Sequence, residues 1–110
     1  MRVSTHVTET ENLAEALQSY VERRLHFALA RFGDRVGQVT VRIGTDGPAE
    51  HRCRISTEVL PFGRVAVEEN DSDLYAAIDR ATGRIGRLFG RELDRSRDVR
   101  FGRESVRTAA

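Results

Sequence analysis

Five arginines recur at helical spacing in the last third of the chain, and their side chains could bind phosphate. They are Arg80, Arg84, Arg87, Arg91 and Arg95, at positions i, i+4, i+7, i+11 and i+15. A guanidinium is planar and permanently charged, and its donors match two phosphate oxygens at once. Residues three and four apart are neighbours on a helix, so the five side chains would form one stripe along a flank. This pattern suggests the binding of a polyanion.

The stretch that carries these arginines, ATGRIGRLFGRELDRSR from Ala81, allows two interpretations: a disordered Gly/Arg segment or a folded helix. Placed at roughly 100° per residue, the side chains of residues 74–95 sort into three faces. One face is apolar, one holds the arginines, and one, on the side away from the core, holds glycine. The apolar face comprises Leu74, Ile78, Ala81, Ile85, Leu88 and Phe89, and the glycines are Gly83, Gly86 and Gly90. A disordered segment would show no such sorting, so the pattern favours a helix.

The three glycines are unfavourable inside this predicted helix, and their presence needs an explanation. Each destabilises a helix by about 1 kcal/mol relative to alanine, so the helix must depend on packing of its apolar face. Alanine at all three positions is therefore expected to raise stability. Two interpretations stay open: the bare surface lets an RNA backbone approach closely, or the glycines reflect drift on an exposed face.

The arginine stripe itself also has two interpretations. A solvated helix face is the simpler one, but five like charges repel each other, and only Glu92 and Asp94 lie nearby to relieve them. The stripe is therefore better explained by an anionic partner such as duplex RNA. Three arginines of an earlier helix either extend the basic surface or are ordinary surface charge near a helix end; they are Arg23, Arg24 and Arg31.

The remaining elements follow from changes in hydrophobic period. Alternation predicts short strands, helical spacing predicts a first helix ended by Gly33, and an acidic segment, 68–79, supplies an N-cap for the second helix at Asp71 or Ser72. The predicted strands are 2–6, 38–43, 52–59 and 65–67, and the first helix is 12–32. The order is β-α-β-β-β-α, with turns short enough to imply antiparallel neighbours. We expect one domain over residues 1–98 and a flexible tail over 99–110.

Length and composition limit the class of protein. With 110 residues, 39% apolar and 32% charged, the chain fits one globular domain. It has no apolar run long enough to cross a bilayer and no apolar leader, so we expect a cytoplasmic protein without membrane contact. The net charge of +1 hides an uneven distribution, because residues 80–110 hold 9 arginines and 4 acidic residues.

Residues with catalytic or metal-binding chemistry are few. His6, His26 and His51 do not combine with each other or with Cys53 at metal-ligand spacing, and Cys53 lies on the apolar side of its strand. Asp71 and Asp73 are explained as helix caps, although Asp71 also belongs to the acidic segment. No phosphate-binding loop or dinucleotide fingerprint occurs. We therefore predict no enzyme, no cofactor, no metal and no small-molecule substrate.

Two motifs resemble a known family. DSDLYAAID at 71–79 resembles the start of the second helix in the bacterial hibernation-promoting factor and ribosome-associated translation inhibitor family, short form, and ALQSYVERRL at 16–25 is similar to its first helix. The resemblance implies an α+β fold like a double-stranded-RNA-binding domain: a mostly antiparallel four-stranded sheet with two helices on one face. It also implies a stress-response, non-enzymatic partner of the small ribosomal subunit that binds rRNA near the decoding centre and silences idle ribosomes.

The resemblance also suggests roles for individual residues. Arg84, Arg87, Arg91 and Arg95 match basic positions of the family's second helix, and Arg23 and Arg24 match a basic pair in its first. Tyr75 would pack, and Asp79 would either lie on the helix surface or pair locally; neither would contact RNA. The sequence departs from the family at Leu88, at Arg91-Glu92-Leu93, and at Phe27 and Leu29, where charge is common.

The C-terminal dimerisation domain of the long family forms is missing from this sequence, so we do not expect the chain to dimerise ribosomes by itself. We also expect a monomer off the ribosome. The alternative is a protein-interaction or self-association module, in which the acidic segment 68–79 pairs with the arginine stripe.

Overall fold

The computed structural model describes the backbone of residues 1–7 and 11–109 and the side chains of residues 1–5 and 15–95. The elements follow the predicted order, with one additional 3-10 segment, η1, after the first helix. They are β1 (Arg2–Val7), α1 (Glu11–Leu29), η1 (Ala30–Arg35), β2 (Val36–Thr45), β3 (His51–Val59), β4 (Gly63–Asp71) and α2 (Leu74–Ala109). The predicted α+β class is confirmed.

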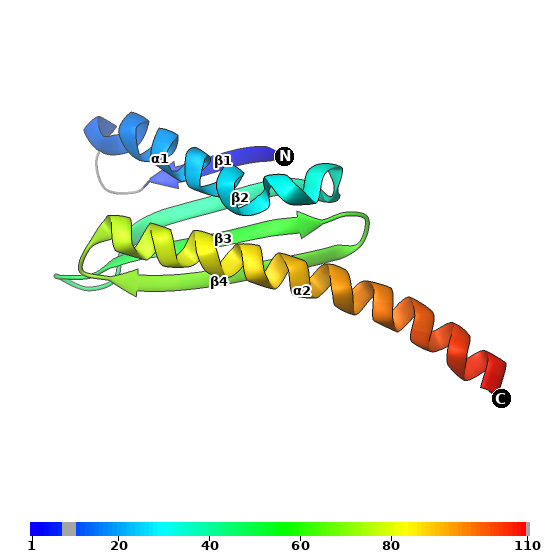
Figure 1. Ribbon diagram of the computed structural model, residues 1–110. Helices are drawn as coiled ribbons and strands as arrows, with labels where there is room; N and C mark the ends of the chain where they lie inside the picture. Colours follow the sequence, from blue (N-terminus) through cyan, green and yellow to red (C-terminus); the bar gives the residue numbers. More distant parts are fainter. Residues whose placement is uncertain (8–10, 110) are drawn as a thin grey trace.

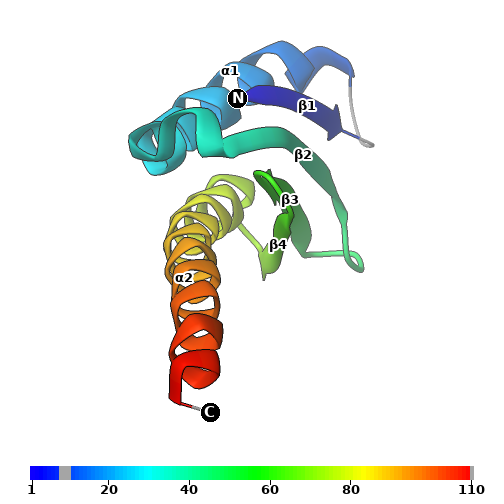
Figure 2. The same ribbon diagram turned by 90° about the vertical axis from the view of Figure 1, so that its right-hand side faces the viewer.

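The four strands form one sheet in the order β1-β2-β3-β4. β1 is parallel to β2, whereas β2, β3 and β4 are joined by short turns and pair antiparallel. Both helices cover the same face: α1 lies beside β1 and β2, and α2 crosses β3 and β4 (Figures 1 and 2). This is the mostly antiparallel sheet with helices on one face that the sequence predicted.

The core lies between the helices and the sheet. Strand alternation places one set of side chains toward the helices, and the register aligns Val41 with Ile55 and Ile55 with Val67. From α1, the buried side chains are Leu17, Val21, Leu25 and Leu29. The opposite face of the sheet is uncovered, and there Arg42 and Arg54 are exposed and directly opposite each other.

The first helix ends earlier than predicted. Helix α1 stops at Leu29, and the chain then turns through η1, within which Gly33 has a φ of +59°. The positive φ expected of Gly33 is thus present, but inside a 3-10 segment rather than at the end of the α-helix. The apolar pattern extended to Phe32 because η1 keeps that ring packed on Phe89, with centroids 4.6 Å apart.

The acidic segment differs from the prediction. Residues 68–71 belong to β4, where they pair with β3, and α2 begins only at Leu74. The N-cap is Asp73, whose carboxylate accepts the N–H of Tyr75 at 3.0 Å, while Asp71 accepts the N–H of Asp73 at 2.8 Å. Backbone pairing with β3 outweighs the low strand propensity of Asp and Asn. Both aspartates do make capping-type bonds, as predicted.

The second helix is long. Its backbone is helical through Ala109 and extends beyond the sheet (Figure 1), where the sequence predicted a tail without regular structure. The flexibility of residues 99–110 and the domain limit at 98 stay predictions. Despite this length, no helix in the described part of the chain has the apolar stretch needed to span a membrane.

Candidate nucleic-acid interface

The buried inner face of α2 fixes the direction of the other side chains of the helix over residues 74–95. Ile78, Ala81, Ile85 and Phe89 are fully buried, as the helical pattern predicted, and Leu74 and Leu88 are partly buried. The pattern missed Ala77 and Thr82, which are also buried. The Thr82 hydroxyl is satisfied locally because it donates to the Ile78 carbonyl at 2.9 Å.

The first two arginines of the stripe are paired with β4. Arg80 forms an ion pair with Asp71 and donates to the Asn70 carbonyl at 3.0 Å, and Arg84 Nη1 lies 2.8 Å from Glu69 Oε2. The sequence predicted little acidic relief for the stripe because residues 68–71 were assigned to the approach to the helix. As a strand, these residues run beside α2, so two of the five arginines of the predicted stripe are already neutralised.

The next two arginines remain uncompensated. Arg87 and Arg91 are exposed and make no ion pair with any residue in the described part of the chain. Arg95 is paired within the helix, since its Nη2 lies 2.8 and 2.9 Å from the two carboxylate oxygens of Glu92. Its side chain stays 72% exposed, so this i,i+3 pair contributes little to stability and is easily exchanged.

The arginines of α1 and η1 have three different environments. Arg24 Nε lies 3.2 Å from Asp79, which also accepts the hydroxyl of Tyr20, so Arg24 helps to join α1 to α2. The Arg23 guanidinium lies 6.0 Å from the Tyr20 ring centroid and that of Arg31 lies 4.7 Å from the Phe32 centroid.

Asp79 is therefore paired, but with two residues of α1 that are distant in the sequence. Tyr75 packs edge-on against Tyr20, with ring centroids 4.8 Å apart.

Gly86 and Gly90 of α2 lie against neighbouring elements, contrary to the helical-wheel prediction, whereas Gly83 is half-buried with open space beside it. A methyl group added at Gly86 would lie 3.1 Å from the Ala28 carbonyl oxygen and 3.3 Å from its Cβ. One added at Gly90 would lie 3.6 Å from the Phe32 ring. The side of α2 away from the sheet core therefore packs against α1 and η1. At Gly86 the close neighbour is a protein backbone, not an RNA backbone.

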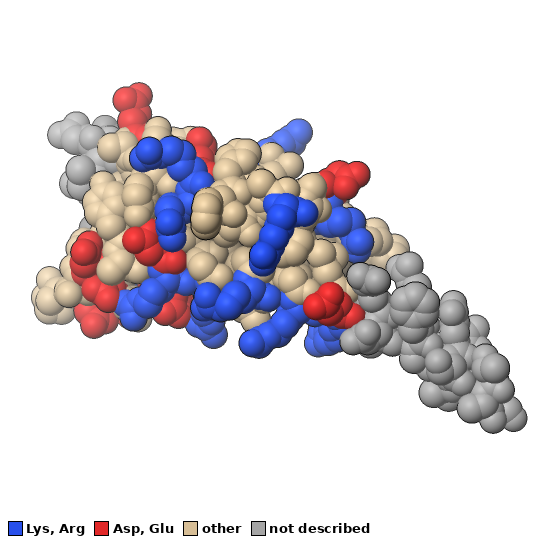
Figure 3. Space-filling view, in the orientation of Figure 1, with Lys and Arg blue, Asp and Glu red and all other residues tan. Residues whose placement is uncertain are grey.

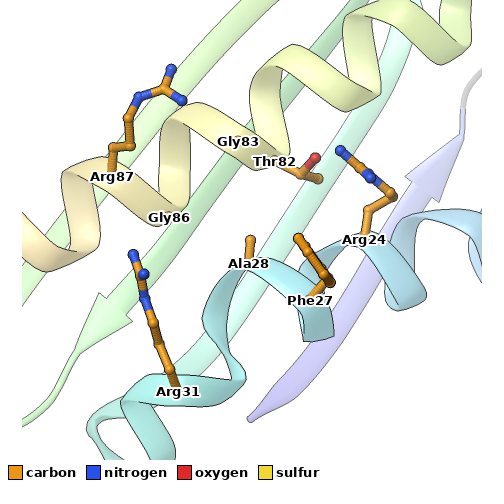
Figure 4. Close-up of a pocket in the computed structure, with 8 residues that line it drawn as sticks. All are labelled: Arg24, Phe27, Ala28, Arg31, Thr82, Gly83, Gly86 and Arg87. Atoms are coloured by element: carbon orange, nitrogen blue, oxygen red, sulfur yellow. The ribbon is translucent and has the colours of Figure 1, made fainter.

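A hollow of about 200 Å³ lies between the two helices near these glycines (Figure 4). Three arginines line it together with Phe27, a residue that the sequence did not identify as functional. Phe27 is 86% exposed, because it lies outside the apolar stripe by which α1 packs on the sheet. The signal was its position out of phase with Leu25 and Leu29. The arginines that the structure brings together here are Arg24, Arg31 and Arg87.

Charge is unevenly spread over the helical face. Basic side chains are distributed along α2 and the facing part of α1, whereas acidic side chains are more numerous toward the end at which α2 begins, although some also lie toward the opposite end (Figure 3). Arg80 and Arg84 lie beside that acidic end, next to β4, and Arg87 and Arg91 lie beyond it. The predicted site is therefore divided into a compensated part and a free part.

Other reactive groups do not form a site. Cys53 is fully buried, and burial raises the pKa of its thiol to about 12. Within the described residues, no group of three His, Cys, Asp or Glu side chains is placed to hold a metal ion. The His6 side chain lies outside the described residues.

Comparison with known proteins agrees with this geometry. Residues 5–97 match the model of the family described as Sigma 54 modulation protein / S30EA ribosomal protein. A protein of Deinococcus radiodurans, named ribosome hibernation promotion factor, is 33% identical over 73 residues. That match covers 64% of this chain and 38% of the Deinococcus protein, so the chain corresponds to well under half of that relative.

Two solved structures share the fold. The N-terminal domain of Protein Y from Thermus thermophilus has 33% identity and a TM-score of 0.69, and the match covers 83% of this chain and 98% of that domain. A ribosomal subunit interface protein from Coxiella burnetii has a TM-score of 0.73 at 13% identity, over 86% of this chain and 99% of that one. At that identity the second likeness concerns the fold alone.

Proposed function

Because the chain belongs to the Sigma 54 modulation protein / S30EA ribosomal protein family, we propose that it is a ribosome-associated, non-enzymatic factor that silences idle ribosomes. Its partner is the rRNA of the small subunit near the decoding centre, and its place is the cytoplasm, where ribosomes are. The name of the Deinococcus relative, a hibernation promotion factor, supports the same role. So does the agreement in fold with Protein Y.

One observation carries the proposed binding site. Arg87 and Arg91 are exposed on the helical face and have no acidic partner among the described residues. Two uncompensated guanidinium groups one turn apart are stabilised by an anionic polymer, and RNA phosphates supply one. Arg95 lies one further turn along and can exchange its exposed pair with Glu92 for phosphate.

The alternative function, a protein-interaction module, would need the acidic side chains of segment 68–79 to be free for a partner. Glu69 and Asp71 already form ion pairs with Arg84 and Arg80 of the same chain. A second copy would have to compete with these intramolecular pairs. We therefore keep the monomeric RNA-binding factor as the proposed function.

The test is sedimentation with purified small subunits. We expect wild-type protein to pellet with the subunits and R87E/R91E to remain in the supernatant at about 150 mM salt, because binding of this kind depends on phosphate contacts. If both residues contact phosphate on single strands, R87Q/R91Q should make the plot of log K against log salt concentration less steep, reducing the magnitude of its slope by about 1.4.

The matched control is R42E/R52E. It changes net charge by the same amount on the open face of the sheet, where Arg42 and Arg52 are exposed. We expect this control to pellet like wild type. If R87E/R91E pellets equally well, the proposed site is wrong; if both variants fail equally, binding follows net charge alone.

A further inference from the structure

The hollow between α1 and α2 combines an exposed aromatic side chain with arginines. Phe27 exposes 86% of its area, and Arg24, Arg31 and Arg87 line the same hollow. A single exposed aromatic residue is common and needs no explanation. An exposed aromatic ring surrounded by guanidinium groups is the combination that binds unpaired nucleotides, because the ring stacks on a base and arginine holds its phosphate.

The geometry suits a polymer that lies along the helices. In Figure 4, Phe27 extends from α1 and Arg31 from η1 toward α2, and the backbone of α2 at Gly83 and Gly86 forms the opposite wall. Arg87 lies on the rim: a methyl group added at Gly83 would be 3.6 Å from its Nη1. The rim arginine also borders the neighbouring hollow of about 300 Å³ that Arg80 and Arg84 line.

The size of the hollow argues for one group of a larger ligand. Its volume of about 200 Å³ is below the roughly 300 Å³ at which pockets for free small molecules begin. The hollow is therefore too small to enclose a free nucleotide cofactor. It can receive one base of a strand whose other nucleotides lie outside.

We propose that this hollow binds one unpaired nucleotide of RNA, with the base stacked on Phe27 and the adjoining phosphates held by Arg31 and Arg87. The inference rests on the proposed function, since it specifies what the same helical face recognises. Stacking of a base on Phe27 requires single-stranded RNA, whereas the arginine contacts of the proposed function require only phosphate. Gly83 keeps the hollow open because it has no side chain.

The first test compares two exposed phenylalanines. Fluorescence anisotropy at low salt measures binding of a labelled single-stranded RNA hexamer to wild type, F27A and F62A. Phe62 is 96% exposed at the β3–β4 turn, outside the hollow, and is the matched control. We expect F27A to weaken binding roughly 5- to 150-fold, the range for loss of one stacked base, and F62A to leave it unchanged. Equal affinities for F27A and F62A would overturn the proposal, as would absence of measurable binding by the wild type.

A second test reports on the base itself. The chain contains no tryptophan, so F27W introduces a single indole at the proposed contact. Stacking should quench its fluorescence when the hexamer binds, whereas a hexamer of the same length without bases should bind through its phosphates without quenching. Equal fluorescence changes with both oligonucleotides would mean that Phe27 contacts no base.

A third variant separates binding from folding. G83L places a side chain in the hollow at a helical position with free space, so it should block the base while thermal stability is kept or raised. A G83L protein that binds the hexamer like wild type would contradict the proposal.

The proposed function is judged separately by R87E/R91E and small subunits. If F27A loses affinity for subunits but not for the hexamer, Phe27 contacts ribosomal protein and the nucleotide proposal fails alone.

Discussion

Gly86 and Gly83 lie one turn apart on α2, and alanine should have opposite effects at the two positions. In a helix interior, alanine is favoured over glycine by about 1 kcal/mol. At Gly83 nothing opposes this gain, because the nearest atom to an added methyl is the flexible end of Arg87 at 3.6 Å. We expect G83A to stabilise the domain by up to about 1 kcal/mol, equivalent to a rise in Tm of roughly 4–8 °C for a domain of this size.

At Gly86 the added methyl meets α1. It would lie 3.1 Å from the Ala28 carbonyl oxygen and 3.3 Å from the Ala28 Cβ. The oxygen belongs to the backbone of a regular helix and the Cβ is bonded directly to that backbone, so neither can move independently and the two helices must separate. Overpacking of this kind costs about 1–3 kcal/mol, which exceeds the helix-propensity gain. We expect G86A to be destabilised by up to about 2 kcal/mol.

Urea unfolding of the two variants measures the difference directly, as a change in midpoint at constant m-value. G90A is a useful third variant, because its nearest contact, the Phe32 ring at 3.6 Å, is an ordinary van der Waals distance. It should behave like G83A. The reasoning is refuted if G86A is as stable as G83A, since the helices would then have room at Gly86 that the geometry denies.

Two further predictions concern titratable groups. Cys53 should resist alkylation at pH 8 in the folded protein and react only on denaturation, because burial raises the pKa of its thiol to about 12; rapid labelling followed by mass spectrometry would contradict this. The hydrogen bond to Asp79 raises the pKa of Tyr20 above its usual value near 10, so this bond stabilises the folded state below that pH, and the stabilisation is lost as pH rises through the raised pKa. Urea unfolding should therefore show a stability gap between wild type and Y20F that narrows from pH 9 to pH 11, while the ionisation of Cys53 is common to both proteins and cancels. A gap that does not change with pH would show that the hydroxyl of Tyr20 makes no such contribution.

Most of the fold could be predicted from local patterns. The alternation of Val39, Val41 and Ile43 against polar neighbours identified β2, and the spacing of Ile78, Ala81 and Ile85 identified the buried face of α2. These patterns succeed because they report the local period of burial. The family resemblance, drawn from DSDLYAAID and ALQSYVERRL, is confirmed by the family match over residues 5–97.

The surroundings of the arginine stripe depended on tertiary placement instead. A helical wheel represents one helix alone. It places Gly86 away from the sheet core, but it could not show that Ala28 of α1 covers that side. The wheel also leaves out neighbouring strands, so it could not show that Glu69 of β4 pairs with Arg84, 15 residues later in the sequence. Phe27 was visible as an aromatic residue out of phase in α1, but only the approach of α2 makes it part of a hollow.

This division of the stripe decides how binding can be tested. Arg84 lies 2.8 Å from Glu69, so replacing it with glutamate would place two carboxylates side by side next to β4. Like charges at that distance oppose folding as well as RNA binding, and loss of sedimentation by an Arg84 variant would have two causes. Arg87 and Arg91 have no such partner among the described residues, so their reversal breaks no ion pair of the described fold, and the two new glutamates, four residues apart on an exposed helix face, repel each other by only about 0.2–0.5 kcal/mol. A stripe that is uniform in the sequence therefore contains two arginines that anchor α2 to β4 and two whose charge is available to RNA.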